Sequence, residues 1–575
     1  MSSSHTLKIF YGSETGTAQD VAESLWYDAR YRNIPSEVHN FGNYTIQNLS
    51  DEHCVVFVIA TSGQGEMPVS IRHNWRILCC KSLPNNLLQS VGLTYFAVLG
   101  LGDSSYQKYN FAGKKLYRRL NQLGSIFLTE LGLADDQHEL GVEGTYENFR
   151  DELFQQIWKR NLYPGMILNP DDSGSLPARY KIIYDANFPS MFDEIEDDAF
   201  VETSMLNSER LTAETHFQDA EELRYSPGDV LMVHPNNLPE ALNIVYEILG
   251  FSDDLLDRPF TLIPRETCIP LPSPHLFKEG LTLRRCFERY FDLQMVPRRS
   301  FFRTLGKLSL IKEEKERLLE LAKNIDDYME YCWRPRRTVA ETLRDFHITI
   351  RSVCTEMLFD IFSPIRARAF SIASCPLTHS TIQILVAQVK YKSKRMASPR
   401  LGLCSTYLIR RRSGDTLLVK IRKGTFRWPK QSDAMILVGP GTGVSSFRSI
   451  LAYRKKQLCD EKDASILFFG CRGAQKDYYF ASEWQKLTAA RIIVAFSRDQ
   501  ENKIYVQNKI KEYADEVWNL LKNSNGHLFI AGRAGDMPRE VTTSVEEIAN
   551  NKGEDGKDFI HMLESNGRLQ YDTWN

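Results

Sequence analysis

The stretch LKIFYGSETGTAQDVAE, residues 7–23, decides the class of the N-terminal part of the fold. It begins with a short apolar run that is typical of a strand and continues with the apolar spacing of a helix. Between the two lie a pair of glycines, which permit a tight turn, and the hydroxyl side chains of Ser13, Thr15 and Thr17. Free N–H groups and a partial positive charge at the amino end of a helix suit a phosphate dianion. Alone, such a turn is structural more often than functional.

The same alternation of strand and helix continues through residues 1–160. CVVFVIA (54–60) and TYFAVLGLG (94–102) read as strands that are apolar almost throughout, and helical spacing follows each of them. This pattern predicts a parallel, doubly wound sheet. Two further loops, 60–68 and 99–113, leave the carboxyl ends of these strands, the edge where such sheets bind ligands. Their glycines let the backbone approach a planar ring, on which Tyr106 or Tyr109 could stack.

Length and composition bound the function. A chain of 575 residues is too long for one hydrophobic core, so we expect three or four domains. A net charge of −2 gives no general attraction to nucleic acid or anionic lipid. The eleven cysteines are scattered and form no CxxC motif, so we expect neither a zinc site nor an iron–sulfur cluster, and no metal site. They fit the reduced thiols of a cytosolic protein. The chain contains no run of 18 apolar residues, so we expect no membrane anchor. The N-terminus shows no pattern of a signal peptide.

Charge is unevenly distributed along the chain. Residues 1–160 are slightly acidic, residues 161–200 are strongly acidic and rich in Pro, Gly, Ser and Asp, and the remainder is basic. The middle segment therefore reads as a linker or hinge. The acidic front and the basic back could attract each other across an interface, or both could be independently solvated.

Three motifs in the second half point to anionic ligands. RARAFSIAS (366–374) places two arginines among apolar strand residues, and such charges need anionic partners. LVGPGTGVSSFRS (437–449) reads as strand, glycine loop and helix, the arrangement that binds a pyrophosphate. AFSRDQENKIYVQ (495–507) groups two cations with Ser and Tyr, which favours the 2′-phosphate of NADPH over the ribose hydroxyls of NADH.

Together these motifs resemble the diflavin reductases, in which a flavodoxin-like domain is fused to a module of the ferredoxin–NADP⁺ reductase family. The resemblance implies an α/β multidomain fold: a flavodoxin-like doubly wound parallel sheet, an FAD-binding β-barrel with a helical insert, and a Rossmann-like NADP-binding domain. The expected domains are the FMN-binding domain (1–160), the acidic linker (161–200), the barrel (201–235 and 361–430), the helical insert (236–360) and the NADPH-binding domain (431–575).

The resemblance also implies binding residues for FMN, FAD and NADPH. The FMN residues are Ser13, Glu14, Thr15, Gly16, Thr17, Ala18, Ala60, Thr61, Ser62, Gly63, Leu99, Gly100, Leu101, Gly102, Asp103, Ser104, Ser105, Tyr106, Gln107, Lys108 and Asp135. The FAD residues are Arg336, Arg368, Ala369, Phe370, Ser371, Gly402, Leu403, Cys404, Ser405 and Trp574. The NADPH residues are Thr442, Ser497, Arg498, Lys503, Ile504, Tyr505, Val506, Gln507 and Glu540.

Two positions depart from the family's usual pattern. Ser62 stands where relatives often have an aromatic residue, so ring stacking on FMN is expected from Tyr106 alone. Ser445 and Ser446 replace the usual Ala-Pro after the glycine loop, a change that should leave the backbone amides intact.

Four residues are expected at the site of hydride transfer. The resemblance groups Ser371, Cys471 and Asp572 around the flavin and the nicotinamide, where they would orient the ring and balance charge. It also places Trp574, the penultimate residue, over the FAD ring, so that it must move before nicotinamide can stack. The alternative is a loosely ordered chain end.

The implied activity is a relay from NADPH through FAD and FMN to a one-electron acceptor protein. Motifs such as GSETGTAQDVAE, GLGDSSYQKYNF and EYCWRPRRT most resemble the branch of the family in cytosolic iron–sulfur cluster assembly, which implies an anamorsin-type iron–sulfur protein as acceptor, in the cytoplasm. A soluble reductase for a haem protein or for methionine synthase is the alternative within the family. A redox-inactive interaction scaffold is the alternative outside it.

Overall fold

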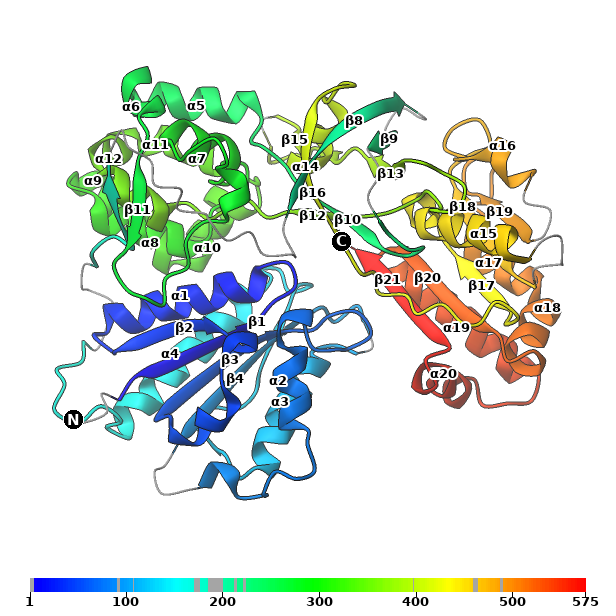
Figure 1. Ribbon diagram of the computed structural model, residues 1–575, viewed down its shortest axis with the longest axis horizontal. Helices are drawn as coiled ribbons and strands as arrows, with labels where there is room; N and C mark the ends of the chain where they lie inside the picture. The colour runs from blue at the N-terminus through cyan, green and yellow to red at the C-terminus, as the bar shows by residue number, and fades with distance from the viewer. Residues whose placement is uncertain are drawn as a thin grey trace. The chain divides into compact units, whose positions relative to one another are not determined.

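The computed structural model describes residues 5–89, 94–106, 108–169, 176–184, 200–210, 215–220, 224–396, 398–458, 464–486 and 490–574 (Figure 1). Gln107 and most of the predicted acidic linker lie outside these residues. The chain forms two compact units, Met1–Phe192 with Glu240–Arg366, and Asp193–Pro239 with Ala367–Asn575. We refer to them as the N-terminal and the C-terminal unit.

A parallel sheet forms the first part of the N-terminal unit, as expected for a flavodoxin-like domain. Its strands run in the order β2–β1–β3–β4, and β4 also pairs with β5 and β6. Helices α2 and α3 contribute to the apolar core on one face, while α1 and α4 pack against each other and against the sheet. The bounds are β1 Leu7–Gly12, α1 Thr17–Tyr31, β2 Ser36–Asn40, β3 Cys54–Ala60, α2 Arg72–Leu78, β4 Tyr95–Gly102, α3 Phe111–Gln122, β5 Ile126–Phe127, β6 Gly132–Asp135 and α4 Glu143–Lys159.

The second part of the N-terminal unit is the helical insert. Short helices surround an aromatic core that includes Phe287, Phe291 and Phe359. A two-stranded ribbon of β7 and β11 accompanies them. The bounds are β7 Tyr180–Ile183, α5 Pro239–Leu249, α6 Asp253–Asp257, β11 Thr261–Pro264, α7 Leu283–Arg289, α8 Arg299–Leu308, α9 Lys312–Lys323, α10 Ile325–Tyr328, α11 Val339–Asp345, α12 His347–Ser352 and α13 Leu358–Ile361.

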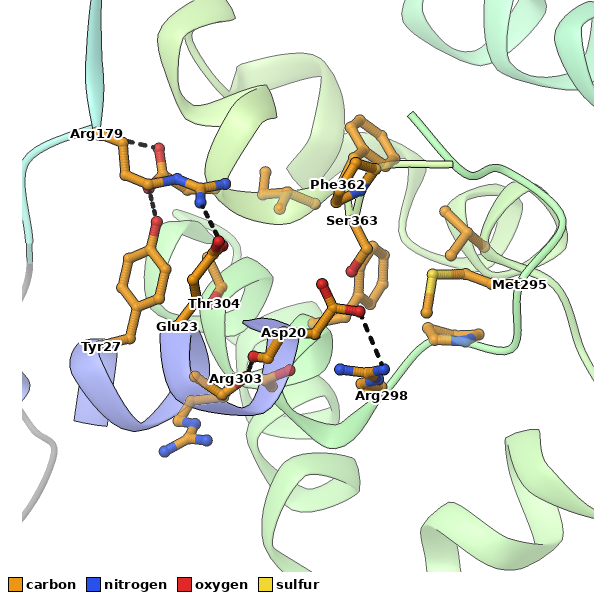
Figure 2. A pocket seen from close by; sticks show the side chains of 18 of the residues that line it. Asp20, Glu23, Tyr27, Arg179, Met295, Arg298, Arg303, Thr304, Phe362 and Ser363 are labelled. Carbon is orange, nitrogen blue, oxygen red and sulfur yellow. Dashed lines mark hydrogen bonds and ion pairs between the residues drawn. The ribbon is translucent and has the colours of Figure 1, made fainter. Parts of the chain in front are cut away.

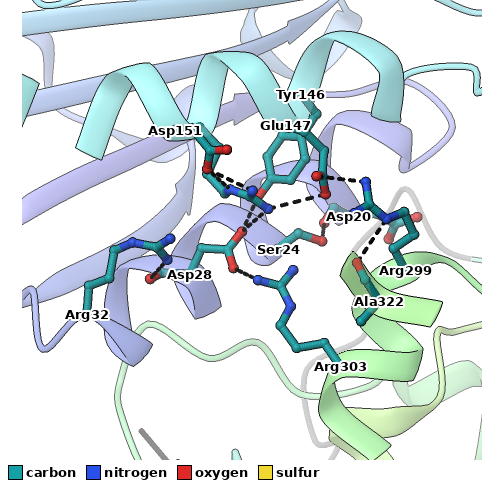
Figure 3. A network of polar contacts seen from close by, with 11 residues as sticks. Asp20, Ser24, Asp28, Arg32, Tyr146, Glu147, Asp151, Arg299, Arg303 and Ala322 are labelled. Atoms are coloured by element: carbon teal, nitrogen blue, oxygen red, sulfur yellow. Dashed lines mark hydrogen bonds and ion pairs between the residues drawn. The ribbon is translucent and has the colours of Figure 1, made fainter. Parts of the chain in front are cut away.

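Charged side chains join the insert to the parallel sheet. Asp28 on α1 is only 1% exposed; it pairs with Arg303 of α8 and accepts a 2.6 Å hydrogen bond from the Tyr146 hydroxyl (Figure 3). Nearby, Glu147 of α4 pairs with Arg299 of α8 at 2.8 Å. The predicted attraction between acidic and basic segments is therefore present here, between the flavodoxin-like helices and the insert. We call this contact the ionic junction.

The ionic junction also borders a cavity of about 80 Å³ that is lined by both charged and apolar side chains (Figure 2). Asp20, Glu23 and Tyr27 line it from α1, and Arg298 and Arg179 line it from the other side. Arg179 pairs with Glu23 at 3.1 Å. The junction is thus built largely from groups that water can also solvate.

An antiparallel barrel forms the first part of the C-terminal unit. The order is β12–β10–β16–β8–β9–β13, and a bridge between Ile372 and Ile384 closes the ring. The bounds are β8 Val201–Arg210, β9 Thr215–Ala220, β10 Val230–His234, β12 Arg368–Ser371, β13 Ile382–Ala387, β14 Lys390–Tyr391, β15 Arg400–Leu401, α14 Leu403–Ile409 and β16 Thr416–Arg422. This is the expected barrel, interrupted in sequence by the helical insert.

A second parallel sheet completes the C-terminal unit, in the order β19–β18–β17–β20–β21. Apolar clusters cover both of its faces, so the expected Rossmann-like arrangement is present. The bounds are β17 Met435–Val438, α15 Val444–Leu458, β18 Ile466–Cys471, α16 Ala481–Trp484, β19 Arg491–Phe496, α17 Val506–Glu512, α18 Ala514–Trp518, β20 His527–Arg533, α19 Asp536–Asn551, α20 Gly556–Ser565 and β21 Leu569–Trp574.

Aromatic rings join this sheet to the barrel. Phe426 and Trp428, which follow barrel strand β16, have ring centroids 5.3 and 4.9 Å from Phe529 of β20. Phe426 also stacks on Phe447 of α15 at 5.8 Å. We call this contact the aromatic junction.

No helix among the described residues is long and apolar enough to cross a membrane. The described part of the chain also brings together no group of three or more His, Cys, Asp or Glu side chains that could hold a metal ion.

Candidate cofactor sites

The loops predicted to bind FMN lie along one edge of the flavodoxin-like sheet. In the strand register Gly12 is level with Ile59, Ala60 with Leu101, and Gly102 with Asp135. The loops after β1, β3 and β4 and the end of β6 therefore emerge side by side, as parallel pairing requires.

The first loop has the shape of an anion cradle. Gly16, with φ of +100°, adopts the left-handed conformation immediately before α1, and its N–H donates to the Ser13 hydroxyl at 2.9 Å. The Glu14 carboxylate accepts hydrogen bonds from the backbone N–H of Val69 and from the Ser62 hydroxyl, at 3.0 and 3.3 Å. Ser62, the departure noted in the sequence, thus ties the second loop to the first. The residues present fit a flavin phosphate at the amino end of α1.

The third loop is organised by Asp135. Its carboxylate accepts hydrogen bonds from the N–H groups of Ser104 (2.8 Å) and Gln137 (3.0 Å). Burial opposes ionisation, but the bonds from Ser104 and Gln137 outweigh it and lower the pKa of Asp135. Tyr109 donates its hydroxyl to the carbonyl of Leu133 and lies under the Lys114 ammonium group. Of the two tyrosines considered for ring stacking, Tyr109 is therefore already engaged on one face.

The predicted FAD strand is β12. Arg368 lies opposite Val233 of β10 and is exposed, while Phe370 packs against the apolar core of the barrel. Burial raises the pKa of the Cys404 thiol to about 12, and the nearby Arg368 charge acts in the opposite direction. The Ser405 hydroxyl accepts the N–H of Val389 at 3.2 Å. An exposed guanidinium beside the loop 402–405 fits a pyrophosphate.

Arg336 is the one predicted FAD residue outside the C-terminal unit. It belongs to the N-terminal unit, adopts a positive φ of 51°, and stacks over Trp333 at 4.4 Å. Its predicted role as an FAD-binding residue stays a prediction.

Asp572 lies where the barrel meets the second sheet. The Thr425 hydroxyl donates to its carboxylate at 2.9 Å. Burial raises the pKa of Asp572, while Thr425 and Arg422 partly offset the shift. Arg422 and Ser371 both lie opposite Val230, on its two sides. Ser371 and Arg422 thus lie on either side of Val230 at one end of the barrel, and Arg422 is close enough to Asp572 to affect its pKa.

Cys471 lies elsewhere on the sheet. It ends β18, which is separated from β21 by β17 and β20. The residue directly opposite Asp572 is Ala531 of β20. Burial raises the pKa of the Cys471 thiol to about 12, with Asp477 and Asp499 adding to the shift. Strand order therefore places Cys471 three strands away from Asp572 along the sheet. The predicted position of both residues around the flavin and the nicotinamide stays a prediction.

Trp574 ends β21 and is not a loose chain end. It lies opposite Arg533, and its carbonyl accepts the N–H of Ala534 at 2.8 Å. Its side chain is 37% exposed. The backbone is thus fixed while much of the indole stays accessible.

The glycine loop after β17 keeps the predicted form. Thr442 lies in the short turn that precedes α15, and the Ser445 hydroxyl donates to its carbonyl at 2.9 Å. Ser445 and Ser446 are both buried. Ser445 thus stabilises the glycine loop through a hydrogen bond, and Ser446 packs in the interior.

The predicted 2′-phosphate residues come from two neighbouring segments. Ser497 and Arg498 follow β19, and their N–H groups donate to the carbonyls of Cys471 and Arg472. Tyr505 precedes α17, and Gln507 in its first turn donates to the Glu540 carboxylate at 2.6 Å. Glu540 therefore lies beside this segment and not in a separate region.

Comparison with known families agrees with each part of this architecture. A flavodoxin family model matches residues 9–149, an FAD-binding domain model matches 203–407, and an oxidoreductase NAD-binding domain model matches 437–542. Curated proteins described as NADPH-dependent diflavin oxidoreductase 1 are similar over the full length. The zebrafish (Danio rerio) protein is 37% identical, with all of both chains covered. The Bos taurus protein is 37% identical over 99% of each chain, and the Schizosaccharomyces pombe protein 33% over all of both.

The chain belongs to the NADPH-dependent diflavin oxidoreductases. It is an oxidoreductase that uses FMN, FAD and NADPH. The three matched regions fall on the flavodoxin-like sheet, on the barrel together with the helical insert, and on the second parallel sheet.

Sequence reasoning missed several residues that organise these sites in the diflavin oxidoreductase. Arg448 of α15 is buried and donates to the carbonyl of Ala373 (3.0 Å) and to the Gln383 side chain (2.8 Å), and it pairs with Glu483. Its position in the predicted glycine-loop helix was the only available signal. Thr425 gave no such signal, and Arg366 was noted only as one of the two arginines in RARAFSIAS that need an anionic partner.

Proposed function

We propose that this diflavin oxidoreductase passes electrons from NADPH through FAD and FMN to an anamorsin-type iron–sulfur protein of cytosolic iron–sulfur cluster assembly. Bound flavins accept an electron pair from a nicotinamide and release single electrons. The observation that carries the relay is the presence in one chain of an FMN edge, an FAD barrel and a nucleotide sheet. The proposed acceptor rests on the sequence motifs shared with the iron–sulfur assembly branch and on similarity over the full length.

The 2′-phosphate of NADPH would be held by the segment 497–507. Arg498 supplies a planar guanidinium and Lys503 an ammonium group, which suit a phosphate rather than a hydroxyl pair. Arg498→Ala should lower kcat/KM for NADPH about tenfold or more, with little change for NADH. Arg491→Ala is the matched control, because Arg491 begins β19, the strand that Arg498 follows, and its side chain pairs with Glu516. An equal loss with both nucleotides would contradict this role.

Ser371, Asp572 and Trp574 would serve the FAD ring. Asp572, with its raised pKa, can hold a proton at its carboxyl group next to Thr425. The Trp574 indole would cover the ring and exclude water until nicotinamide replaces it. In stopped-flow experiments Trp574→Ala should alter the rate of FAD reduction or the preference between NADPH and NADH. An unchanged rate and preference would remove Trp574 from this step.

The identity of the acceptor is tested by comparing the rates at which the enzyme reduces different acceptor proteins. The purified chain, reduced anaerobically with NADPH, is mixed separately with an anamorsin-type iron–sulfur protein, a cytochrome and methionine synthase, and reduction of each is followed by absorbance. We expect faster reduction of the iron–sulfur protein. Faster reduction of the cytochrome or of methionine synthase would favour the alternative acceptors. A colourless protein that takes up neither flavin would favour an interaction scaffold.

We also propose the cytoplasm as the compartment. The ten cysteines among the described residues are free thiols, which suits a reducing environment.

A further inference from the structure

Arg366 is held rigidly by the helical insert. The N–H of Ile365 donates to the carbonyl of Tyr290 at 2.6 Å, and the carbonyl of Ser363 accepts the N–H of Asp292 at 2.8 Å. Pro364 forms an antiparallel bridge with Phe291. The backbone that carries Arg366 is therefore fixed to the aromatic core of the insert, so its side chain starts from a defined position.

The guanidinium of Arg366 lies against the first FMN loop. A Cβ atom added to Gly16 would be 2.6 Å from its Cζ and Nε atoms and 2.7 Å from Nη1. Gly16 is the residue whose left-handed turn opens α1. The guanidinium thus occupies the space next to this glycine, where any other residue would place its side chain.

Two guanidinium groups lie near the amino end of α1. Asp20, in the first turn of α1, pairs with Arg366 and also with Arg298 at 3.4 Å. Two guanidinium groups share this carboxylate, and the amino end of α1 adds a partial positive charge. Glu23 is also near Arg366, but it is already paired with Arg179. A phosphate monoester, with a charge of about −2 near neutral pH, could accept hydrogen bonds from a guanidinium group in this position.

We propose that Arg366 is a phosphate-binding residue of the FMN site, supplied by the helical insert and not by the flavodoxin-like domain. The inference rests on the proposed FMN role of residues 13–18. Its consequence is that the FMN phosphate bridges the insert and the flavodoxin-like domain, so bound FMN strengthens the ionic junction. By linkage, an intact junction increases the affinity for FMN to the same degree. Arg366 also lies two residues before Arg368, at the start of the predicted FAD strand.

The test compares FMN with riboflavin, which has the same ring and no phosphate. Full-length protein depleted of FMN is titrated with each flavin, and the dissociation constants are measured by quenching of flavin fluorescence. Arg366→Ala should weaken FMN binding about tenfold, the effect of losing one charged hydrogen-bond donor, and leave riboflavin binding within about twofold. Arg366→Lys should recover part of the difference, and it also serves if the alanine variant fails to fold.

Arg303→Ala is the matched control. It removes another arginine of the ionic junction, the one that pairs with Asp28 further along α1. By the same linkage, it should weaken FMN binding less than Arg366→Ala does, because the phosphate keeps its proposed partner, and it should leave riboflavin binding within about twofold. Hydrogen–deuterium exchange of α8 should slow on adding FMN but not riboflavin, and Arg366→Ala should abolish this difference.

The titrations distinguish the proposed role of Arg366 from the proposed FMN role of residues 13–18. If Arg366→Ala weakens both flavins equally, Arg366 is only a structural contact and the inference is overturned. If the unmodified protein binds riboflavin as tightly as FMN, the phosphate role of residues 13–18 itself fails.

Discussion

The two junctions inside this enzyme are formed by different kinds of side chain, charged in one and aromatic in the other. The ionic junction holds the flavodoxin-like domain to the helical insert through arginines paired with acidic side chains, beside a small cavity. The aromatic junction holds the nucleotide sheet to the barrel with Phe426, Trp428 and Phe529. Opening the first returns charges to water, which solvates them well, whereas opening the second exposes apolar rings.

The difference assigns separate tasks to the two contacts. In the proposed relay, the FMN of the flavodoxin-like domain must take electrons from within the enzyme and deliver them to another protein. Water solvates these charges once the contact opens, so the contact can break and re-form at modest cost. FAD and NADPH, by contrast, need a constant alignment, and a packed aromatic contact supplies it.

The largest effect is expected from breaking the aromatic junction. Phe529 is fully buried, so Phe529→Ala should destabilise the C-terminal unit by about 3–5 kcal/mol. Calorimetry should show the barrel and the nucleotide sheet unfolding in separate transitions. Phe468→Ala is the control, because Phe468 belongs to the cluster on the other face of the sheet. It should lower stability without separating the transitions; separation in both variants would contradict a special role for Phe529.

A smaller effect is expected from Asp28→Ala at the ionic junction. Arg303 would lose its buried partner, but separation of the junction lets it return to water, so the cost is limited to about 1–3 kcal/mol. Hydrogen–deuterium exchange of α8 should accelerate. Asp253→Ala is the control, since Asp253 is an exposed partner of Arg284 within the insert. Unchanged exchange in α8 would show that the charges do not hold the junction.

Salt should act on one junction only. Raising NaCl from about 0.05 M to about 1 M shortens the screening length several-fold and weakens partly exposed ion pairs by up to about 1 kcal/mol each. Exchange of α8 should therefore increase with salt, whereas the aromatic junction should not loosen. If hydrogen–deuterium exchange of α8 and of β20 increased equally with salt, the ionic and aromatic junctions would not differ in the way described.

The smallest effect is a pH dependence of the ionic junction. Burial raises the pKa of Asp360 above its ordinary value of 3.8, against the opposing influence of Arg179 and Tyr27. Because the folded state binds this proton more tightly than the unfolded chain, its contribution to the free energy of unfolding rises as pH falls from neutral towards 3.8. Denaturation at several pH values should show this rise reduced in Asp360→Asn. An identical pH profile would contradict it.

The sequence predicted those parts of the fold that local patterns determine. Nearly continuous apolar strands followed by glycine loops indicated both parallel sheets, and residues 13–18 were placed correctly at the amino end of α1. Contacts between distant segments could not be predicted. Nothing in RARAFSIAS indicates that Arg366 reaches Gly16, and nothing in YDTWN indicates that Thr425 holds Asp572. The separation of Cys471 from Asp572 depends on strand order, which a single motif does not encode.

The nested path of the barrel has a consequence for synthesis on the ribosome. Strand β10 cannot pair with β12 until the whole helical insert between them has been translated. At about 5–20 residues per second, this delays closure of the barrel by on the order of ten seconds. During that interval the nascent chain carries a finished flavodoxin-like domain and unpaired barrel strands, which chaperones would need to shield.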